Sequence, residues 1–200
     1  MSHIVTLESR SKQLAMQQLY IPYQKIEQLS TFDKWYATSK AELRNFYKYD
    51  VDIESFAEVI QAKQKETIDR KTLVEVLEEQ YTSMETTQAT LENIQALRLD
   101  NTFTVITAHQ PSLFTGPLYF IFKTISTINL AEQLRAKYPA YNFVPVFWLG
   151  SEDHDFEEIS YANIFGKKLM WENEEQGATG MMSTASLQPV LEELKNILGD

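Results

Sequence analysis

The sequence predicts an α/β protein built on a parallel sheet, with a mainly helical region in front of it. Two short apolar segments, 103–108 and 143–149, are typical of buried strands. A helical pattern of about twenty residues lies between them, so the three elements form a βαβ unit with parallel strands and a right-handed crossover. Few strand signals precede this unit. We therefore predict a helical region over 1–100, packed on a core segment over 101–200.

The composition narrows the classes of function. A chain of 200 residues with 44% hydrophobic and 23% charged residues has globular composition, which excludes a wholly disordered protein. The net charge of −10, from 18 basic and 28 acidic side chains, argues against a nucleic-acid partner, because such binding draws most of its affinity from Lys and Arg. The absence of cysteine excludes disulfides, thiolate nucleophiles and zinc–thiolate sites within this chain.

Two further features bear on where the protein works. No apolar run approaches the roughly 18 residues that a membrane span needs. The first ten residues also lack the apolar run of a signal peptide. We expect no membrane partner and a cytoplasmic location.

The first hundred residues carry three helical or aromatic features. Aromatic residues are frequent over 20–49, which we interpret as packing in a core or an inter-domain seam rather than as a ligand-stacking surface. A helix is predicted from Asp52 to Gln64. The longest helical pattern runs from about 70 to 97, and Gln and Thr residues over 86–90 are expected to weaken it. We predict that this amphipathic helix faces the body of the protein.

The second half alternates between strand and helix patterns. After the first strand, Pro117 favours a helix start, and the helix is predicted to continue to about Tyr138, where Pro139 ends it. The second strand is almost continuously apolar, as in a sheet covered on both faces, although Pro145 argues against full pairing on both sides. The later predictions are a loop or short helix over 151–159, short strands joined by a turn at 165–168 with 169–171 as strand, a turn at 177–180, and a helix over 188–198.

Polar side chains follow both predicted strands where they end. His109 and Gln110 come directly after the first strand, and 151–155 follows the second. Because the carboxyl ends of parallel strands lie at one edge of a sheet, where ligands of α/β proteins bind, we expect these side chains to gather there. His109 and His154 would then share a cavity beside several carboxylates.

The segment 151–155 has three interpretations. It begins a helix, with Ser151 or Asp153 as the cap. It holds a divalent ion such as Mg²⁺, Mn²⁺ or Zn²⁺ through oxygen and nitrogen ligands. It performs acid–base chemistry or binds an amine. Its place at a strand end opposite His109 favours a functional role.

The loop 114–117 leads into the helix between the strands. Free N–H groups at a helix start favour an anion such as phosphate, and Gly116 lets the backbone approach a ligand. The alternative is that Thr115 or Ser112 caps the helix. The loop is neither a P-loop nor a dinucleotide-binding glycine motif. Lys123, two turns into the helix, either reaches a phosphate or is solvated.

Two of these segments also resemble the signatures of a known family. Residues 109–119, followed by Lys123, and residues 145–158 are similar to two motifs of the bacillithiol biosynthesis cysteine-adding enzymes, the BshC family. The pair at this spacing is highly specific. Residues 177–181 resemble a weaker family segment, and the first hundred residues fit more loosely. His109 departs from the family pattern, which more often has Gln there.

The resemblance implies a Rossmann-like core with inserted helices that continues beyond residue 200, followed by a coiled-coil domain and homodimerisation. It implies a ligase that joins cysteine to glucosaminyl-malate by an amide bond. ATP is the expected activator, so ATP or ADP would bind, and Mg²⁺ is a candidate ion. No protein metal site is assigned. The alternatives are a non-catalytic nucleotide- or anion-binding module and a nucleotide-dependent ligase with another substrate.

The same resemblance assigns roles to the candidate residues. The catalytic set contains the middle of the second segment, with His154 as the base for the attacking amine: Glu152, Asp153 and His154. The substrate- and nucleotide-binding set contains His109, Gln110, Thr115, Gly116, Tyr119, Lys123, Ser151 and Asp155.

Overall fold

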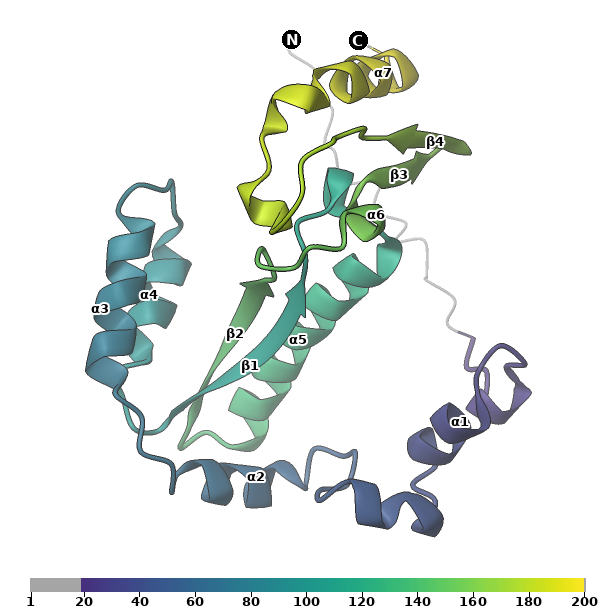
Figure 1. Cartoon of the computed structure of the whole chain (residues 1–200). Coiled ribbons are helices and arrows are strands. Elements are labelled where there is room, and N and C mark those ends of the chain that lie inside the picture. Colours follow the sequence, from purple (N-terminus) through teal and green to yellow (C-terminus); the bar gives the residue numbers. More distant parts are fainter. Residues whose placement is uncertain (1–18, 200) are drawn as a thin grey trace, which may run out of the picture. The chain divides into compact units, whose positions relative to one another are not determined.

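The computed structural model describes residues 19–199, in a chain that divides into two compact units, Met1–Val59 and Ile60–Asp200 (Figure 1). The first ten residues, for which no signal peptide was predicted, lie outside the described residues. Within the described residues, none of the helices combines the length and the apolar character needed to cross a bilayer.

The first unit consists of short helices without a buried core among its described residues. Helix α1, Thr31–Ala37, begins with a capping box in which Ser30 and Asp33 bind each other's backbone N–H groups. Aromatic rings contact one another, but Phe46 is 84% exposed and no residue over 19–59 is buried. The prediction of a core over 20–49 is therefore wrong for this unit by itself, because its short helices leave every described side chain at least partly exposed. The inter-domain seam stays a prediction. The 3₁₀ turns are η2, Tyr23–Lys25, and η3, Ala41–Phe46.

Helix α2, Phe56–Lys63, confirms the helix expected over 52–64. The single helix expected over 70–97 is wrong: the chain forms α3, Arg70–Tyr81, and α4, Gln88–Ala96, which lie side by side (Figure 1). Hydrogen bonds of two threonine hydroxyls favour the break between the helices. Thr82 donates its hydroxyl hydrogen bond to the carbonyl of Glu79, and the Thr87 hydroxyl accepts the N–H of Thr90 as the N-cap of α4. Such side chains compete with the helical backbone pattern.

The βαβ unit is confirmed. Strands β1, Thr102–His109, and β2, Asn142–Leu149, pair in parallel from Thr102↔Asn142 to His109↔Leu149. Helix α5, Leu118–Lys137, connects them (Figure 1). The expected α/β class with a parallel sheet therefore holds.

Helices cover both faces of this sheet. On one face, Val74 of α3 and Ile94 of α4 are buried in a cluster with Val144 of β2. On the other, Phe120 of α5 packs edge-on against Phe147, with ring centroids 5.2 Å apart. Because successive strand residues point to opposite faces, Val144 and Phe147 lie on different sides. The amphipathic pattern over 70–97 thus faces the body of its own unit, as predicted, but as two helices.

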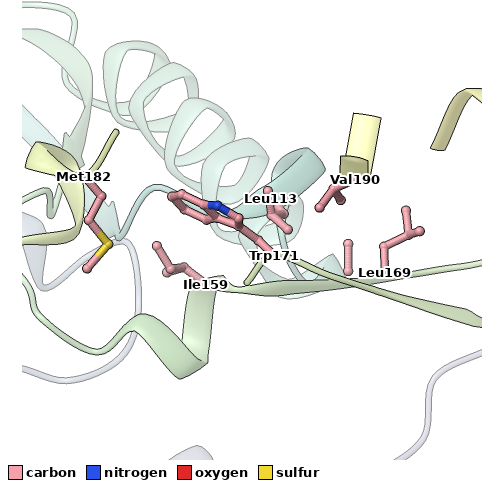
Figure 2. Close-up of a cluster of buried hydrophobic side chains, with 7 residues drawn as sticks. Leu113, Ile159, Leu169, Trp171, Met182 and Val190 are labelled. Atoms are coloured by element: carbon pink, nitrogen blue, oxygen red, sulfur yellow. The ribbon is translucent and has the colours of Figure 1, made fainter. Parts of the chain in front are cut away.

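A second hydrophobic cluster lies beyond the strand ends (Figure 2). Its buried members come from a 3₁₀ turn, a short helix, a hairpin, the last helix and the connections between these last two, and they are Leu113, Ile159, Ala162, Leu169, Trp171, Met182 and Val190. The elements that supply or flank it are η4, Leu113–Thr115; α6, Phe156–Ile159; β3, Tyr161–Ile164; β4, Lys167–Met170; η5, Thr179–Met181; η6, Thr184–Leu187; and α7, Gln188–Leu198.

The hairpin and the last helix follow the predictions, except that Lys167 and Lys168, expected in the turn, belong to β4. β3 and β4 pair antiparallel, and the turn between them is Phe165–Gly166. Trp171, expected as strand, lies just after β4, and its N–H donates to the carbonyl of Ser160 over 2.6 Å. Helix α7 begins with Gln188 and Pro189, because the fixed φ of proline suits the first turn of a helix.

Candidate functional site

The two predicted segments leave the sheet side by side. His109 and Leu149 are cross-strand partners at the ends of β1 and β2. One residue later, the N–H of Gly150 donates to the carbonyl of His109 over 2.8 Å. The expectation that both segments start from one sheet edge is therefore confirmed.

His109 lies half-buried against α5. Its ring stacks on Tyr119, with centroids 5.2 Å apart and planes 19° apart. Burial lowers the pKa of His109, the Lys123 ammonium lowers it further, and Glu158 opposes both. The imidazole is thus neutral at pH 7.

The tautomer of His109 follows from its one hydrogen bond. Nδ1 accepts the backbone N–H of Gln110 over 2.8 Å, so the proton of the neutral ring sits on Nε2. Nε2 is buried and has no hydrogen-bond partner in the described part of the chain. The ring therefore carries an unused donor at the sheet edge.

Gln110 has a buried amide beside the second segment. The residue is 7% exposed, and neither its Oε1 nor its Nε2 has a well-aligned hydrogen-bond partner among the described residues. The amide nevertheless approaches the Asp153 carboxylate closely enough to help lower the pKa of that group. Leaving a buried polar group unpaired costs about 1–3 kcal/mol, so such groups call for an explanation, and a polar ligand supplies one.

The loop before α5 is strained. Phe114 and Thr115 have φ of 48° and 72°, and Gly116 has φ of 63° and ψ of −155°. Non-glycine residues in this region cost about 1–3 kcal/mol each, and such strain is concentrated at functional sites. A Cβ on Gly116 would lie 2.8 Å from the Cβ of Ser112, so only glycine fits there.

The start of α5 carries no side-chain cap. Its N-cap residue is Pro117, and no side chain hydrogen-bonds to the first turn. The alternative in which Thr115 or Ser112 caps this helix is therefore wrong, because the Gly116–Pro117 turn separates both from it. The positive end of the helix dipole remains available to an anion.

Lys123 and Tyr119 pack around the end of β1. The Lys123 Nζ donates to the carbonyl of Ala108 over 2.5 Å and lies 5.7 Å from the centroid of the Tyr119 ring. Lys123 is thus neither simply solvated nor directed away from the site. Together with the stacked His109 ring, these side chains form one face of the strand end.

The segment 151–155 is a tight turn with a cap at its end. The Asp153 carboxylate accepts the N–H of Asp155 over 3.0 Å, and this bond is the main cause of its lowered pKa. The cap of α6 is Asp155, whose carboxylate accepts the N–H of Glu158. The prediction that Ser151 or Asp153 caps this helix is therefore wrong, because the helix begins only at Phe156.

The remaining members of this segment face outward. The His154 side chain is 88% exposed, and its Nδ1 lies 3.8 Å from Oδ1 of Asp153. Glu152 accepts the indole N–H of Trp148 over 3.5 Å. At this exposure the described part of the chain builds no shared cavity around His109 and His154, contrary to expectation. The reason is that the turn directs His154 away from the sheet.

The described residues do not support the interpretation of 151–155 as a metal site. Over residues 19–199, no group of three His, Asp or Glu side chains comes together as metal ligands. The Asp153 and Asp155 carboxylates are instead used in backbone hydrogen bonds of the turn.

A third segment, 177–181, for which the sequence predicts a turn and a weaker resemblance to the family but no site residue, lies against the second. Thr179 donates its N–H to the carbonyl of Asp153 over 2.7 Å, and Gly180 donates to that of Ser151 over 2.9 Å. A Cβ on Gly180 would come within 2.3 Å of the Cβ of Ser151, so the close approach requires glycine. The signal that could have identified this contact is the Gly180 position within 177–181.

A small cavity lies beside these segments. Its volume is about 210 Å³, and neither imidazole lines it. The hydroxyl of Thr179, which is 4% exposed, is unpaired at its wall. The other lining residues are mostly apolar: Pro111, Ser112, Leu113, Ile159, Trp171, Gly180, Met182, Thr184 and Leu187.

Comparison with known proteins gives relatives that share one name. Three are each named "Putative cysteine ligase BshC". The protein from Flavobacterium psychrophilum is 46% identical over 90% of this chain and 34% of its own length. The protein from Flavobacterium johnsoniae is 45% identical over 86% of this chain and 33% of its own length. The protein from Christiangramia forsetii is 49% identical over 78% of this chain and 30% of its own length. The chain thus spans about a third of the length of the curated relatives it matches.

A family profile covers nearly the whole chain. The profile described as "Bacillithiol biosynthesis BshC, N-terminal Rossmann-like domain" matches residues 16–200. This range includes every candidate residue described above, and the α/β unit with its parallel strands agrees with a Rossmann-like fold. The chain therefore belongs to the BshC family, of which it carries the N-terminal Rossmann-like domain.

Proposed function

We propose that this chain is part of a ligase that joins cysteine to glucosaminyl-malate by an amide bond in bacillithiol biosynthesis. The observation that carries the proposal is the pair of unused buried polar groups, His109 Nε2 and the Gln110 amide, at the sheet edge beside the uncapped start of α5. The printed name of the relatives, "Putative cysteine ligase BshC", supports the reaction class.

The nucleotide side of the site is proposed at the first segment. When bound, ATP would supply the activation that a carboxylate needs before an amine attacks it. The residues present suit a polar, anionic group: the His109 Nε2–H and the Gln110 amide offer donors, and Thr115 and Gly116 lead into the free N–H groups of α5. Tyr119 holds the imidazole in place by stacking.

The amine side is proposed at the second segment. The lowered pKa of Asp153 keeps its carboxylate ionised at pH 7, which suits binding of an ammonium group. His154, beside it, is the proposed base that accepts the proton of the attacking amine. Glu152, Ser151 and Asp155 complete this segment. Because residues 19–199 bring no metal-ligand set together, an Mg²⁺ ion would take most of its ligands from nucleotide phosphates.

The remaining expectations belong to the longer protein. The coiled coil and the homodimer contacts are proposed for the part of the relatives that this chain does not span. The cytoplasm is the proposed place of the reaction.

Activity of variants in the full-length protein tests the amine side. Asp153→Asn and His154→Ala should each lower the rate of cysteine addition about 10²–10⁴-fold, as general acid–base and binding groups do. Glu66→Gln, which changes an exposed carboxylate paired with Lys63, is the control and should keep the wild-type rate. Wild-type rates in both test variants would remove this segment from the mechanism.

Calorimetry separates this proposal from its alternatives. ATP, ADP and glucosaminyl-malate are titrated separately, and product formation with cysteine is then measured. Binding of a nucleotide without any turnover favours a non-catalytic module. Turnover with another acceptor, but not with glucosaminyl-malate, favours a ligase with a different substrate.

A further inference from the structure

The cavity beside the two segments of the candidate site has a neutral, mostly apolar wall. We propose that it holds the thiol side chain of the cysteine substrate. This inference rests on the proposed function, because it gives a place to one substrate of that reaction. It also goes beyond that function, since none of the residues assigned above to the nucleotide or the amine side lines the cavity.

The cavity adjoins both segments. Pro111, one of its walls, directly follows Gln110 along the chain. Thr179 and Gly180 form another wall, and their N–H groups donate to the carbonyls of Asp153 and Ser151. One side of the cavity therefore continues from the first segment, and another is hydrogen-bonded to the second. A substrate held by these segments is close enough to place a short side chain there.

The size and charge of the cavity select among the groups that the proposed substrates carry. Its volume of about 210 Å³ is below the roughly 300–1,000 Å³ of pockets that take drug-sized ligands, so a whole nucleotide or sugar conjugate does not fit. None of its lining residues is charged. The phosphates of ATP and the carboxylates of malate would therefore be buried without a countercharge, which is costly. The CH₂–SH group of cysteine is small, neutral and largely apolar.

The walls also suit a sulfur atom. The side chains of Ile159, Trp171 and Met182, drawn in Figure 2, are among them. A thiol behaves as a small hydrophobic group, and sulfur makes favourable contacts with aromatic rings. At the same wall, the buried Thr179 hydroxyl has no hydrogen-bond partner among the described residues. A thiol is a weak donor and a weak acceptor, so it supplies a partner for this hydroxyl.

The chemistry of amide formation gives a reason for such a place. The thiol of cysteine takes no part in the new amide bond, yet its thiolate is a nucleophile that competes with the amine for an activated carboxylate. Apolar surroundings disfavour the thiolate form. A thiol held in this cavity therefore stays protonated and apart from the reacting groups.

Kinetics of a Thr179 variant in the full-length protein test the proposal. Thr179→Val removes the hydroxyl and keeps the shape of the side chain. It should raise the KM for cysteine about 3–10-fold, the effect of one weak hydrogen bond, and leave kcat and the KM values for ATP and glucosaminyl-malate within about twofold. Thr179→Ser should restore the KM for cysteine. Thr104→Val, the same change at an exposed position of β1, is the control and should leave all these constants unchanged.

A cysteine analogue separates the hydroxyl contact from a general disturbance of the site. 2-Aminobutyrate has a methyl group in place of the thiol and should inhibit competitively with cysteine. Because it makes no hydrogen bond with the Thr179 hydroxyl, its inhibition constant should change less than about twofold in Thr179→Val. An equal loss for cysteine and 2-aminobutyrate contradicts the proposed contact.

The other outcomes distinguish this inference from the proposed function. If the wild-type protein forms product and Thr179→Val leaves the KM for cysteine unchanged, the thiol site is wrong and the proposed function stands. A rise in the KM for ATP alone overturns the thiol site in favour of the nucleotide base. A wild-type protein that forms no product from cysteine contradicts the proposed function, and this assignment fails with it.

Methionine-methyl NMR gives a readout that does not depend on turnover. On titration of the full-length protein with cysteine, the methyl signal of Met182, which lines the cavity, should shift. The signal of Met84, which is 51% exposed between α3 and α4, is the internal control and should not shift. A Met182 signal that stays in place at a saturating cysteine concentration would overturn the proposal.

Discussion

His109 combines three properties that a surface histidine lacks. Its ring is stacked on Tyr119, its Nδ1 is used by the backbone of Gln110, and its Nε2 is buried and unpaired. Each property follows from position: the last residue of β1 faces the first turn of α5 because the crossover helix packs directly on the strand it follows. The result is a neutral ring with a fixed tautomer, which offers a donor without carrying charge. This suits hydrogen bonding to a ligand atom better than it suits charge pairing.

The pKa of His109 gives a prediction about pH. Because the pKa is lowered in the folded chain, the unfolded chain takes up this proton first as pH falls below about 6.5. The contribution of His109 to stability is therefore complete above that pH and declines as pH falls toward the folded pKa. An NMR titration should give a His109 midpoint below 6.5, with the neutral ring protonated at Nε2. In His109→Gln, thermal unfolding should depend less on pH just below about 6.5. A midpoint at or above 6.5 contradicts the prediction.

At the scale of elements, the site depends on contacts between segments distant in sequence. The turn at 151–155 is held from one side by its own side chains and from the other by the backbone N–H groups of Thr179 and Gly180. Helix α7 and the hairpin fix η5 through the second hydrophobic cluster, in which Trp171 and Met182 are buried (Figure 2). The position of the second segment therefore depends on packing about thirty residues further along the chain.

Substitution of Gly180 tests this dependence. Gly180→Ala places a Cβ against Ser151 and should push η5 away from the turn, destabilising the chain by about 1–3 kcal/mol in urea unfolding. Gly177→Ala is the matched control, because its Cβ meets no atom within 4 Å although its φ is +103°. Gly180→Ala should additionally shift the NMR signals of residues 151–155, whereas the control should not. Because Gly177 has a positive φ and Gly180 does not, strain can destabilise the control but not Gly180→Ala. A Gly180→Ala variant with wild-type stability and unshifted signals over 151–155 would contradict the contact with Ser151.

At the scale of the whole molecule, the two units differ in how much they bury. The described residues of the first unit include no buried side chain, whereas the second contains two hydrophobic clusters. Segments with little buried apolar surface open at low free energy, and the stability of the chain therefore resides in the second unit.

Limited proteolysis of the 200-residue chain tests this difference. Chymotrypsin should cleave first within 19–59, where exposed Tyr23, Phe32 and Phe46 are available, and should leave a longer-lived fragment that contains β1 to α7. Trypsin gives the matched comparison, because Lys25, Lys34 and Lys48 offer cleavage sites in the same unit. First cuts in the second unit by both enzymes would contradict this distribution of stability.

The sequence by itself determined the local elements of the second half and the edge at which the polar segments meet. The strands, α5, the hairpin and α7 were predictable because apolar periodicity, Pro117 and the turn residues act over a few neighbours. Likewise, the parallel pairing follows from the short βαβ connection, so the approach of His109 to Gly150 was predictable.

Only the tertiary structure decided what depends on distant partners. Local hydroxyl bonds favour the break at 82–87, but the pairing of α3 with α4 depends on the cluster that both share with Val144. The exposure of His154 depends on where α6 begins. The unpaired state of the Gln110 amide and the contact of Gly180 with Ser151 arise from packing of segments far apart in sequence. Periodicity and spacing carry no information about such contacts, because these depend on how layers pack rather than on how neighbours along the chain repeat.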